Sequence, residues 1–465
     1  MRVTARLETG LGGKGECRLE LPPPAISRLM LADGGRVTIH FGHAHGLAEV
    51  QPATRPREGS LRFAPALSGR FLAGHPLRLG RSPEGVRLGP LIGVMTLFAA
   101  SRPRVTASLG PQDASLRGLA RTAAAQGAVV AVFWPGAFRP HRAALRGYVL
   151  SPSGARWRRL TLPWPDIVYN RVSSRSRERR AGLQAVYRAL DARYGPRFFN
   201  PGYLDKWDVY RWLRARPDTA AYMPDTVRFG SGGLRDMVAR HPVLYLKQSG
   251  GSLGLGIIRI DRLGSSAFLV RHQRGPGEVR RFVARGLGGL RGTVRRLIKT
   301  RAYLVQQGID LATFAGRAYD VRALAQKDGR GRWTLTGMAA RVAGRGGIAT
   351  HVPNRGTRQP LLTALRSSFG SEELVARIAA DLEQATLILA RGLDEERGDR
   401  FGELSLDLAV DRAGRIRVLE LNAKPLRFDE DVIRQQAWLR LVEYSRYLLR
   451  FNPLPDEADA ADSGS

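Results

Sequence analysis

The sequence has a single cysteine, Cys17, among its 465 residues. One thiol excludes an internal disulfide and a cysteine-based zinc site. Long apolar runs are also missing, so we expect no transmembrane helix and no membrane partner, and the first residues lack the apolar region of a secretory signal. Because 43% of the residues are hydrophobic, the composition predicts a folded globular protein, which we expect to be cytoplasmic.

Lysine is also scarce, since six of the 74 basic residues are lysines and the other 68 are arginines. The net charge of +33 suggests a nucleic-acid partner. The arginines are spread along the whole chain, however, whereas nucleic-acid-binding proteins usually concentrate their charge on one face, so this partner is disfavoured. Dense stretches at 173–180 and 271–301 keep other anionic partners open. Arginine does not replace lysine where a compact charge must meet phosphate oxygens, which makes Lys206, Lys247 and Lys424 candidates for such positions.

Residues 243–260 predict two strands joined by a glycine-rich loop. Lys247 ends the first strand, and a second apolar strand starts directly after the last loop glycine. A Walker loop or a dinucleotide-binding fingerprint needs a helix at that point, so both are excluded. Glycines let backbone N–H groups approach anionic oxygens, so the loop is a candidate phosphate flap. A mobile surface hairpin stays open as the alternative. The loop glycines are Gly250, Gly251, Gly254 and Gly256.

Composition and periodicity divide the chain into four segments. Residues 1–90 predict a β-rich N-terminal module, and residues 91–200 alternate buried strands with a helix, which is typical of a parallel α/β layer. Residues 201–452 predict antiparallel strand pairs with flanking helices. Residues 453–465 form an acidic tail that we expect to be disordered. The predicted fold class is therefore a combination of α+β and α/β.

The hairpin predicted at 404–424 carries a candidate metal site. Glu420 and Asn422 are two residues apart on one strand, so their side chains share a face. The turn near Ala413 can place Asp407 of the partner strand opposite them. Two carboxylates and an amide oxygen suit Mg²⁺ that keeps waters and bridges phosphates. An exposed acidic strand face is the alternative, but Glu420 lies between leucines, where an unpaired carboxylate would be costly.

Two arginines are candidates for phosphoryl stabilisation. Asp320 and Arg322 share a strand face, and an arginine held by a nearby carboxylate is well placed to meet a transferring phosphoryl group. A structural ion pair explains the same pattern equally well. Arg341 ends the next predicted strand and can join the same pocket.

In order and spacing, these pieces resemble the ATP-grasp ligase family over about residues 200–450. The more specific segments YNR, FFNPGYLDKW, VQQGIDL, YDVR and LELNAKP resemble its YheC/YheD branch, a group of endospore-coat-associated proteins. The resemblance implies a pre-ATP-grasp domain at 91–200 and a two-subdomain ATP-grasp nucleotide-binding and catalytic domain at 201–452. The family-like residues are Lys206, Lys247 with the glycine loop up to Gly256, Val305–Asp310, Asp320, Arg322, Asp407, Glu420 and Asn422.

The resemblance also implies roles for these residues, with ATP and Mg²⁺ as cofactors. Nucleotide contacts are implied for Lys206 and Lys247 at the phosphates, for Gly250, Gly251, Ser252, Gly254 and Gly256 as the lid, for Gln306, Gln307 and Ile309 at the adenine, and for Asp310 at the ribose. Metal ligation is implied for Asp407, Glu420 and Asn422. Catalytic roles are implied for Arg322 and Arg341 at the transferring phosphoryl. Lys424, which departs from the family pattern, is assigned to a substrate carboxylate or a phosphate.

The leading functional hypothesis is an ATP- and Mg²⁺-dependent carboxylate–amine (or thiol) ligase that acts through an acyl-phosphate. Its partners would be a small-molecule or peptide carboxylate and an amine or thiol acceptor, with a possible association with the spore coat. The alternative is a non-catalytic spore-coat structural or assembly protein that keeps the ATP-grasp fold. A basic nucleic-acid-binding protein is the third and least favoured hypothesis.

Overall fold

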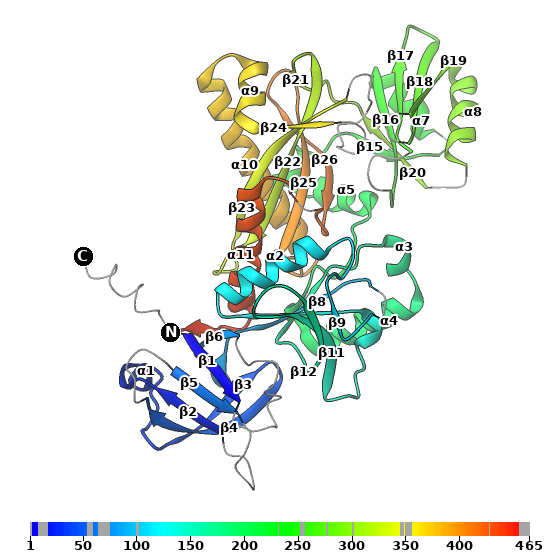
Figure 1. Ribbon diagram of the computed structural model, residues 1–465. Coiled ribbons are helices and arrows are strands. Elements are labelled where there is room, and N and C mark those ends of the chain that lie inside the picture. Colours follow the sequence, from blue (N-terminus) through cyan, green and yellow to red (C-terminus); the bar gives the residue numbers. More distant parts are fainter. Residues whose placement is uncertain are drawn as a thin grey trace. The chain divides into compact units, whose positions relative to one another are not determined.

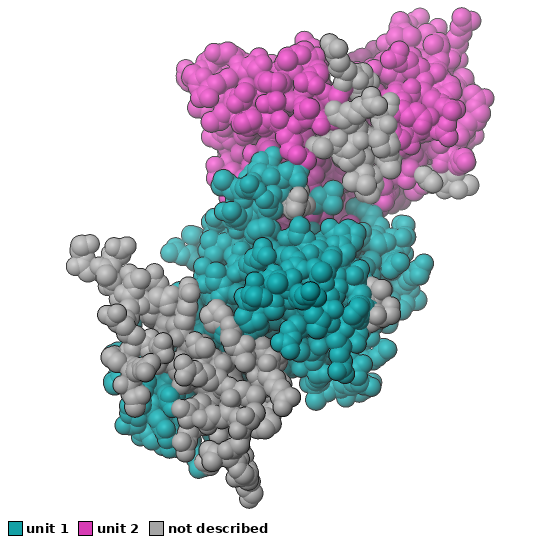
Figure 2. All heavy atoms as spheres, in the orientation of Figure 1, with its two compact units in different colours: residues 1–202, 327–332, 426–465 teal, residues 203–326, 333–425 magenta. Residues whose placement is uncertain are grey.

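The chain divides into two compact units, coloured teal and magenta in Figure 2. Unit 1 comprises residues 1–202, 327–332 and 426–465, and unit 2 comprises residues 203–326 and 333–425. Ser252, Gly254 and the predicted tail from residue 455 onward lie outside the described residues. The computed structural model (Figure 1) describes residues 2–7, 17–53, 59–63, 75–98, 102–230, 232–251, 256–275, 278–299, 302–344, 348, 356–426 and 428–454.

Unit 1 begins with a β-rich module, as the alternating N-terminal sequence predicts. Its strands run in the order β1-β5-β2-β4-β3-β7-β6-β27, and a further pairing of β1 with β6 closes the first seven into a ring. Leucine and valine side chains fill its core. The elements are β1 (Arg2–Leu7), β2 (Cys17–Leu21), α1 (Pro23–Arg28), β3 (Arg36–Phe41), β4 (Ala44–Pro52), β5 (Gly59–Phe63), β6 (Pro76–Ser82), β7 (Gly85–Leu88) and β27 (Asn452–Pro453).

A second sheet in unit 1 forms the predicted α/β layer, in the order β14-β13-β8-β10-β11-β12-β9. The first four strands in this order are parallel to one another. This arrangement confirms the parallel layer that the buried strands of this segment predict. The elements are β8 (Leu91–Met95), β9 (Val105–Thr106), α2 (Asp113–Ala125), β10 (Val129–Phe133), β11 (Ala144–Leu150), β12 (Trp157–Pro163), β13 (Ile167–Asn170), α3 (Arg175–Glu178), α4 (Ala181–Tyr194) and β14 (Phe198–Phe199).

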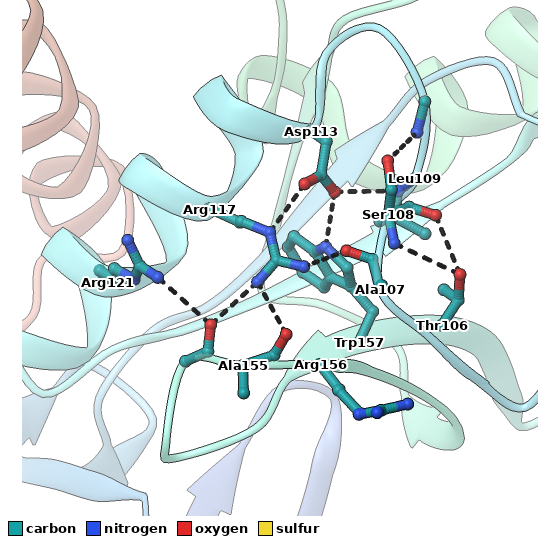
Figure 3. A network of polar contacts seen from close by, with 12 residues as sticks. Thr106, Ala107, Ser108, Leu109, Asp113, Arg117, Arg121, Ala155, Arg156 and Trp157 are labelled. Carbon is teal, nitrogen blue, oxygen red and sulfur yellow. Dashed lines mark hydrogen bonds and ion pairs between the residues drawn. The ribbon is translucent and has the colours of Figure 1, made fainter.

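Polar contacts fix the start of α2 (Figure 3). Asp113 accepts hydrogen bonds from Leu109 N, Arg117 Nε and Trp157 Nε1 at 2.9, 2.7 and 2.8 Å. The last long helix, α11 (Asp431–Leu448), packs on α2 so closely that a Cβ at Gly118 would lie 2.1 Å from Trp438. This helix therefore clusters with unit 1, although the sequence groups it with residues 201–452.

Unit 2 contains two mainly antiparallel sheets. The first has the order β15-β20-β16-β17-β18-β19, and helices α7 and α8 pack on one of its faces. Its opposite face, which we call the open face, carries the side chains that alternate with this core. The elements are α5 (Lys206–Ala215), α6 (Pro217–Ala220), β15 (Thr226–Arg228), α7 (Gly233–Arg240), β16 (Val243–Gln248), β17 (Ile258–Arg262), β18 (Ala267–Gly275), β19 (Glu278–Arg285), α8 (Gly286–Ile298) and β20 (Tyr303–Gln307).

The other sheet of unit 2 has the order β24-β23-β22-β25-β26, and the long helix α10 packs against its apolar side chains. Every residue of β25 is buried, including Glu403, Ser405 and Asp407, which alternate with its apolar residues. The predicted mixture of α+β and α/β is thus confirmed. The elements are β21 (Thr313–Phe314), β22 (Arg317–Lys327), β23 (Trp333–Val342), β24 (Thr357–Pro360), α9 (Leu361–Phe369), α10 (Glu372–Glu395), β25 (Glu403–Val410) and β26 (Ile416–Asn422).

Candidate functional site

Lys206 is the first residue of α5 and links two candidate parts of the site. Asp205 caps this helix by accepting a hydrogen bond from Trp207 N at 2.9 Å. The ammonium of Lys206 then donates to the carbonyl of Gly251 at 2.5 Å and lies 3.1 Å from Oε1 of Glu420. One side chain therefore connects the glycine loop to a predicted metal ligand.

Lys247 lies on β16 and points to the open face of its sheet. It donates to Oε1 of Gln306 at 2.6 Å and to the carbonyl of Leu419 at 3.4 Å. Burial lowers the pKa of Lys247 to about 8, with Glu420 opposing this change and Lys206 reinforcing it. With this pKa the ammonium form of Lys247 still predominates at neutral pH, and an anion bound beside Lys206 and Lys247 would favour that form further.

These residues line one pocket of about 440 Å³, counting its opening to solvent. Two ammonium groups, a carboxylate and an amide meet aliphatic side chains there, a combination that fits a flat apolar ring system joined to an anionic group. The lining residues are Lys206, Val209, Tyr210, Met223, Thr226, Lys247, Leu304, Gln306, Val418, Leu419, Glu420 and Leu421.

The β25–β26 hairpin pairs the predicted metal ligands as its sequence suggests. Asp407 lies directly opposite Glu420, and Ser405 lies opposite Asn422, with a register shift just after Asp407. Oxygen donors gathered in this way suit Mg²⁺, so the residues present fit the ion that the spacing predicts. Among the described residues, no group of three His, Cys, Asp or Glu side chains could hold a metal, so the amide of Asn422 would have to complete this set.

Arg341 is buried between two carboxylates. It donates to both oxygens of Asp320 at 2.8 Å and lies 2.9 Å from Oδ2 of Asp407, with side-chain exposures of 5%, 1% and 3% for Arg341, Asp320 and Asp407. Burial by itself would lower the pKa of Arg341, but the two carboxylates raise it above its ordinary value. Asp320 thus holds Arg341, a pairing that the sequence did not predict. Arg322 lies opposite Asp407 on the neighbouring strand.

The remaining predicted residues lie in more varied settings. Gln306 and Gln307 belong to β20, and Gln307 N donates to Asp225 O at 2.8 Å. Ile309 follows the strand. The carboxylate of Asp310 is 78% exposed and lies 3.2 Å from Arg412 Nε. Lys424 is buried, with its ammonium 4.7 Å from the ring centre of Tyr203.

Hydrogen bonds anchor the glycine loop at both of its described ends. Ser249 Oγ donates to the Asp205 carboxylate at 2.6 Å, a contact that links the loop to α5 and that local sequence does not signal. Gly250 and Gly251 follow it. At the other end Gly256 has φ +73°, where glycine is favoured, and Tyr303 Oη donates to its carbonyl at 2.9 Å.

Two antiparallel sheets that contribute to one lysine-lined pocket are typical of the ATP-grasp fold, and this chain has that fold. It belongs to the YheC/D-like ATP-grasp family, because a family model of that description matches residues 195–448, more than half of the chain. No helix among the described residues is long and apolar enough to cross a membrane.

Two Bacillus subtilis (strain 168) proteins are similar to the chain. Endospore coat-associated protein YheD is 26% identical over 344 residues, or 74% of each chain. Endospore coat-associated protein YheC is 21% identical over 296 residues, which cover 63% of this chain and 80% of YheC. Among solved structures, the D-alanine-D-alanine ligase of Coxiella burnetii aligns with a TM-score of 0.43 and 12% identity, covering 81% of this chain and all of the ligase chain.

Proposed function

We propose that the protein is an ATP- and Mg²⁺-dependent carboxylate–amine (or thiol) ligase that acts through an acyl-phosphate. The observation that carries this proposal is the convergence of Lys206 and Lys247 on one pocket that also contains Glu420. Both cations favour a polyphosphate, and the aliphatic lining favours a base. Membership of the ATP-grasp family supports the nucleotide as the ligand.

The chain's own residues then have defined tasks. Lys206 and Lys247 bind phosphate oxygens, and the loop of Gly250, Gly251 and Gly256 excludes water from them. Gln306, Gln307 and Ile309 orient the base, and Asp310 binds the ribose hydroxyls. Asp407, Glu420 and Asn422 hold Mg²⁺, which supplies charge neutralisation for phosphoryl transfer when it is bound.

Three further side chains act on the reacting groups in this proposal. Arg322 stabilises the transferring phosphoryl group, and Lys424 binds a substrate carboxylate or a phosphate. Arg341, which is fully occupied by Asp320 and Asp407 in this structure, acts mainly by orienting Asp407. The reaction joins a small-molecule or peptide carboxylate to an amine or thiol acceptor and releases ADP and phosphate.

The test is a thermal-shift screen with ATP and Mg²⁺ over candidate carboxylates, followed by phosphate-release assays on the hits with amine and thiol acceptors. We expect phosphate release that depends on both co-substrates and is lost in Lys247→Ala. Full nucleotide affinity in Lys247→Ala would contradict the proposal. Nucleotide binding without turnover on any substrate would instead support the alternative, a structural or assembly protein of the spore coat, which the names of the two relatives favour.

A further inference from the structure

A row of arginines crosses the open face of the first sheet of unit 2. Arg259 on β17 pairs directly with Arg271 on β18, which pairs with Arg281 on β19. Directly paired residues of antiparallel strands point to the same face, and neighbouring strands lie about 4.8 Å apart. The three guanidinium groups therefore form one line across the strands. Arg285, four positions after Arg281, extends the positive charge on the same face.

This row starts beside the candidate nucleotide pocket. Arg259 pairs with Tyr245 on β16, and Tyr245 pairs with Gln306, which lines the pocket. The helices α7 and α8 cover the other face of the sheet, where Leu244, Ile260 and Val270 are buried. The arginine face is thus the side that these helices leave uncovered.

Contacts within the row hold its inner members in place. Asp261 accepts from Arg259 Nη2 at 2.7 Å and from Arg271 Nη2 at 2.7 Å, and Arg259 also donates to Tyr245 Oη at 3.2 Å. Such contacts reduce the rotamer freedom that a ligand would otherwise have to restrict. The outer members differ, because within the described chain Arg281 and Arg285 have no ion-pair partner and are exposed.

Apolar side chains lie next to this charge. Leu269 on β18 pairs with Val283 on β19, and Val283 is 64% exposed on an edge strand of the sheet. Arg281 lies opposite Arg271, and like charges placed opposite each other on neighbouring strands destabilise a sheet. A ligand that neutralises the exposed Arg281 and covers the exposed Val283 would remove this cost.

We propose that this face binds an acidic, extended peptide segment with interspersed apolar side chains. Carboxylates meet the guanidinium groups of Arg271, Arg281 and Arg285, and apolar side chains cover Leu269 and Val283. Single-stranded nucleic acid fits less well, because among the described residues of this face the aromatic side chain of Tyr245 is engaged by Arg259 rather than presented for base stacking. The inference goes beyond the proposed ligase activity, since the binding requires neither ATP nor turnover.

The test measures fluorescence anisotropy of a labelled peptide of about twelve alternating glutamate and alanine residues, at about 0.15 M salt so that weak long-range attraction is screened. The Arg281→Glu/Arg285→Glu variant should bind at least about tenfold more weakly than the unaltered chain. The matched control is Arg291→Glu/Arg295→Glu, which makes the same charge change at exposed positions of α8, on the covered side of the sheet. It should change the affinity by less than about threefold. If the first variant does not fold, Arg281→Gln/Arg285→Gln should weaken binding by about threefold.

Three results would overturn the proposal. One is no binding of the peptide to the unaltered chain, and another is an equal loss in both charge-reversal variants, which would mean general attraction to a basic protein. The third is tighter binding of a labelled single-stranded oligonucleotide of equal charge through Arg281 and Arg285, which would identify the partner as nucleic acid. Loss of ligase activity plays no part in these outcomes, so failure of this inference and failure of the proposed function are separate.

Discussion

Lys206 and Glu420 form an ion pair, with 3.1 Å between Nζ and Oε1, while the same ammonium donates to the carbonyl of Gly251 at 2.5 Å. The ion pair links α5 to β26, and the hydrogen bond from the same ammonium to Gly251 links both elements to the glycine loop. In the proposed function, phosphates and Mg²⁺ compete for these groups, so Lys206 exchanges partners when the nucleotide binds.

The first prediction removes this charge. Lys206→Met should weaken ATP binding about 10-fold to 100-fold, because a charge-assisted contact of about 1.5–3 kcal/mol is lost. Isothermal titration calorimetry in the presence of Mg²⁺ measures the change. Lys299→Met, which neutralises an exposed lysine after α8, is the control and should leave the affinity unaltered. Equal affinities of the two variants would contradict the assignment of Lys206 to phosphate binding.

The second prediction concerns protons and Lys247. Burial lowers its pKa to about 8, so part of the population is neutral at pH 8.5. A polyanion next to Lys247 favours the ammonium form, so ATP binding at pH 8.5 should take up a proton. Calorimetry in two buffers of different ionisation enthalpy detects this uptake. Lys247→Arg stays charged throughout this range and should show none. A buffer-independent binding enthalpy for the unaltered protein would rule the idea out.

The same pKa has a consequence for stability. A lysine whose pKa is lowered on folding binds fewer protons in the folded than in the unfolded state between its folded pKa, about 8, and its ordinary value of 10.5. The contribution of Lys247 to the free energy of unfolding therefore rises with pH across this window and is least favourable below it. In Lys247→Met this rise should be absent, which chemical denaturation at pH 7.5 and 9.5 would show.

The third prediction uses burial to separate two ion pairs of similar geometry. Asp320→Asn should destabilise unit 2 by about 3 kcal/mol, because Arg341 keeps its buried charge and loses a bidentate partner. Glu372→Gln breaks the exposed pair with Arg366, whose contacts are 2.8 and 3.1 Å, and should have no measurable effect on the urea midpoint. Asp320→Asn should also weaken Mg²⁺-dependent ATP binding, since Arg341 no longer orients Asp407. Similar urea midpoints for the two variants would contradict the structural role of Asp320.

Several features of the site were predictable because they depend on spacing within one hairpin. Glu420 and Asn422 share a face through simple alternation, and the turn after Asp411 sets Asp407 opposite Glu420. The strand that follows Gly256 excluded a Walker loop for the same local reason. The mixed fold class also followed from local periodicity, as in the continuous apolar runs of the parallel strands.

Other features required registers that local sequence does not encode. The pairing of Asp320 with Arg341 depends on how β22 and β23 align, whereas the sequence placed Asp320 with Arg322 on one strand face and Arg341 only in the same pocket. The packing of α11 on α2 joins segments about 300 residues apart, and an apolar helix face does not specify its partner. The arginine row depends on the register of three strands. Because arginines are frequent throughout the sequence, those of the row do not stand out from the others.

The last prediction concerns the closing end of the glycine loop. At Gly256, with φ +73°, an added Cβ would lie 2.5 Å from Gln248 Nε2 and 3.0 Å from Tyr303 Oη. Gly256→Ala therefore adds the strain of a left-handed backbone, about 1–2 kcal/mol, and displaces the side chains that anchor the loop. The control is Gly230→Ala, where nothing lies within 4 Å of the new Cβ. Gly256→Ala should speed hydrogen exchange in β17 and weaken ATP binding, while Gly230→Ala should change neither. Unaltered exchange in Gly256→Ala would mean that these anchors do not hold the loop, and the loop would then be a surface hairpin rather than a lid.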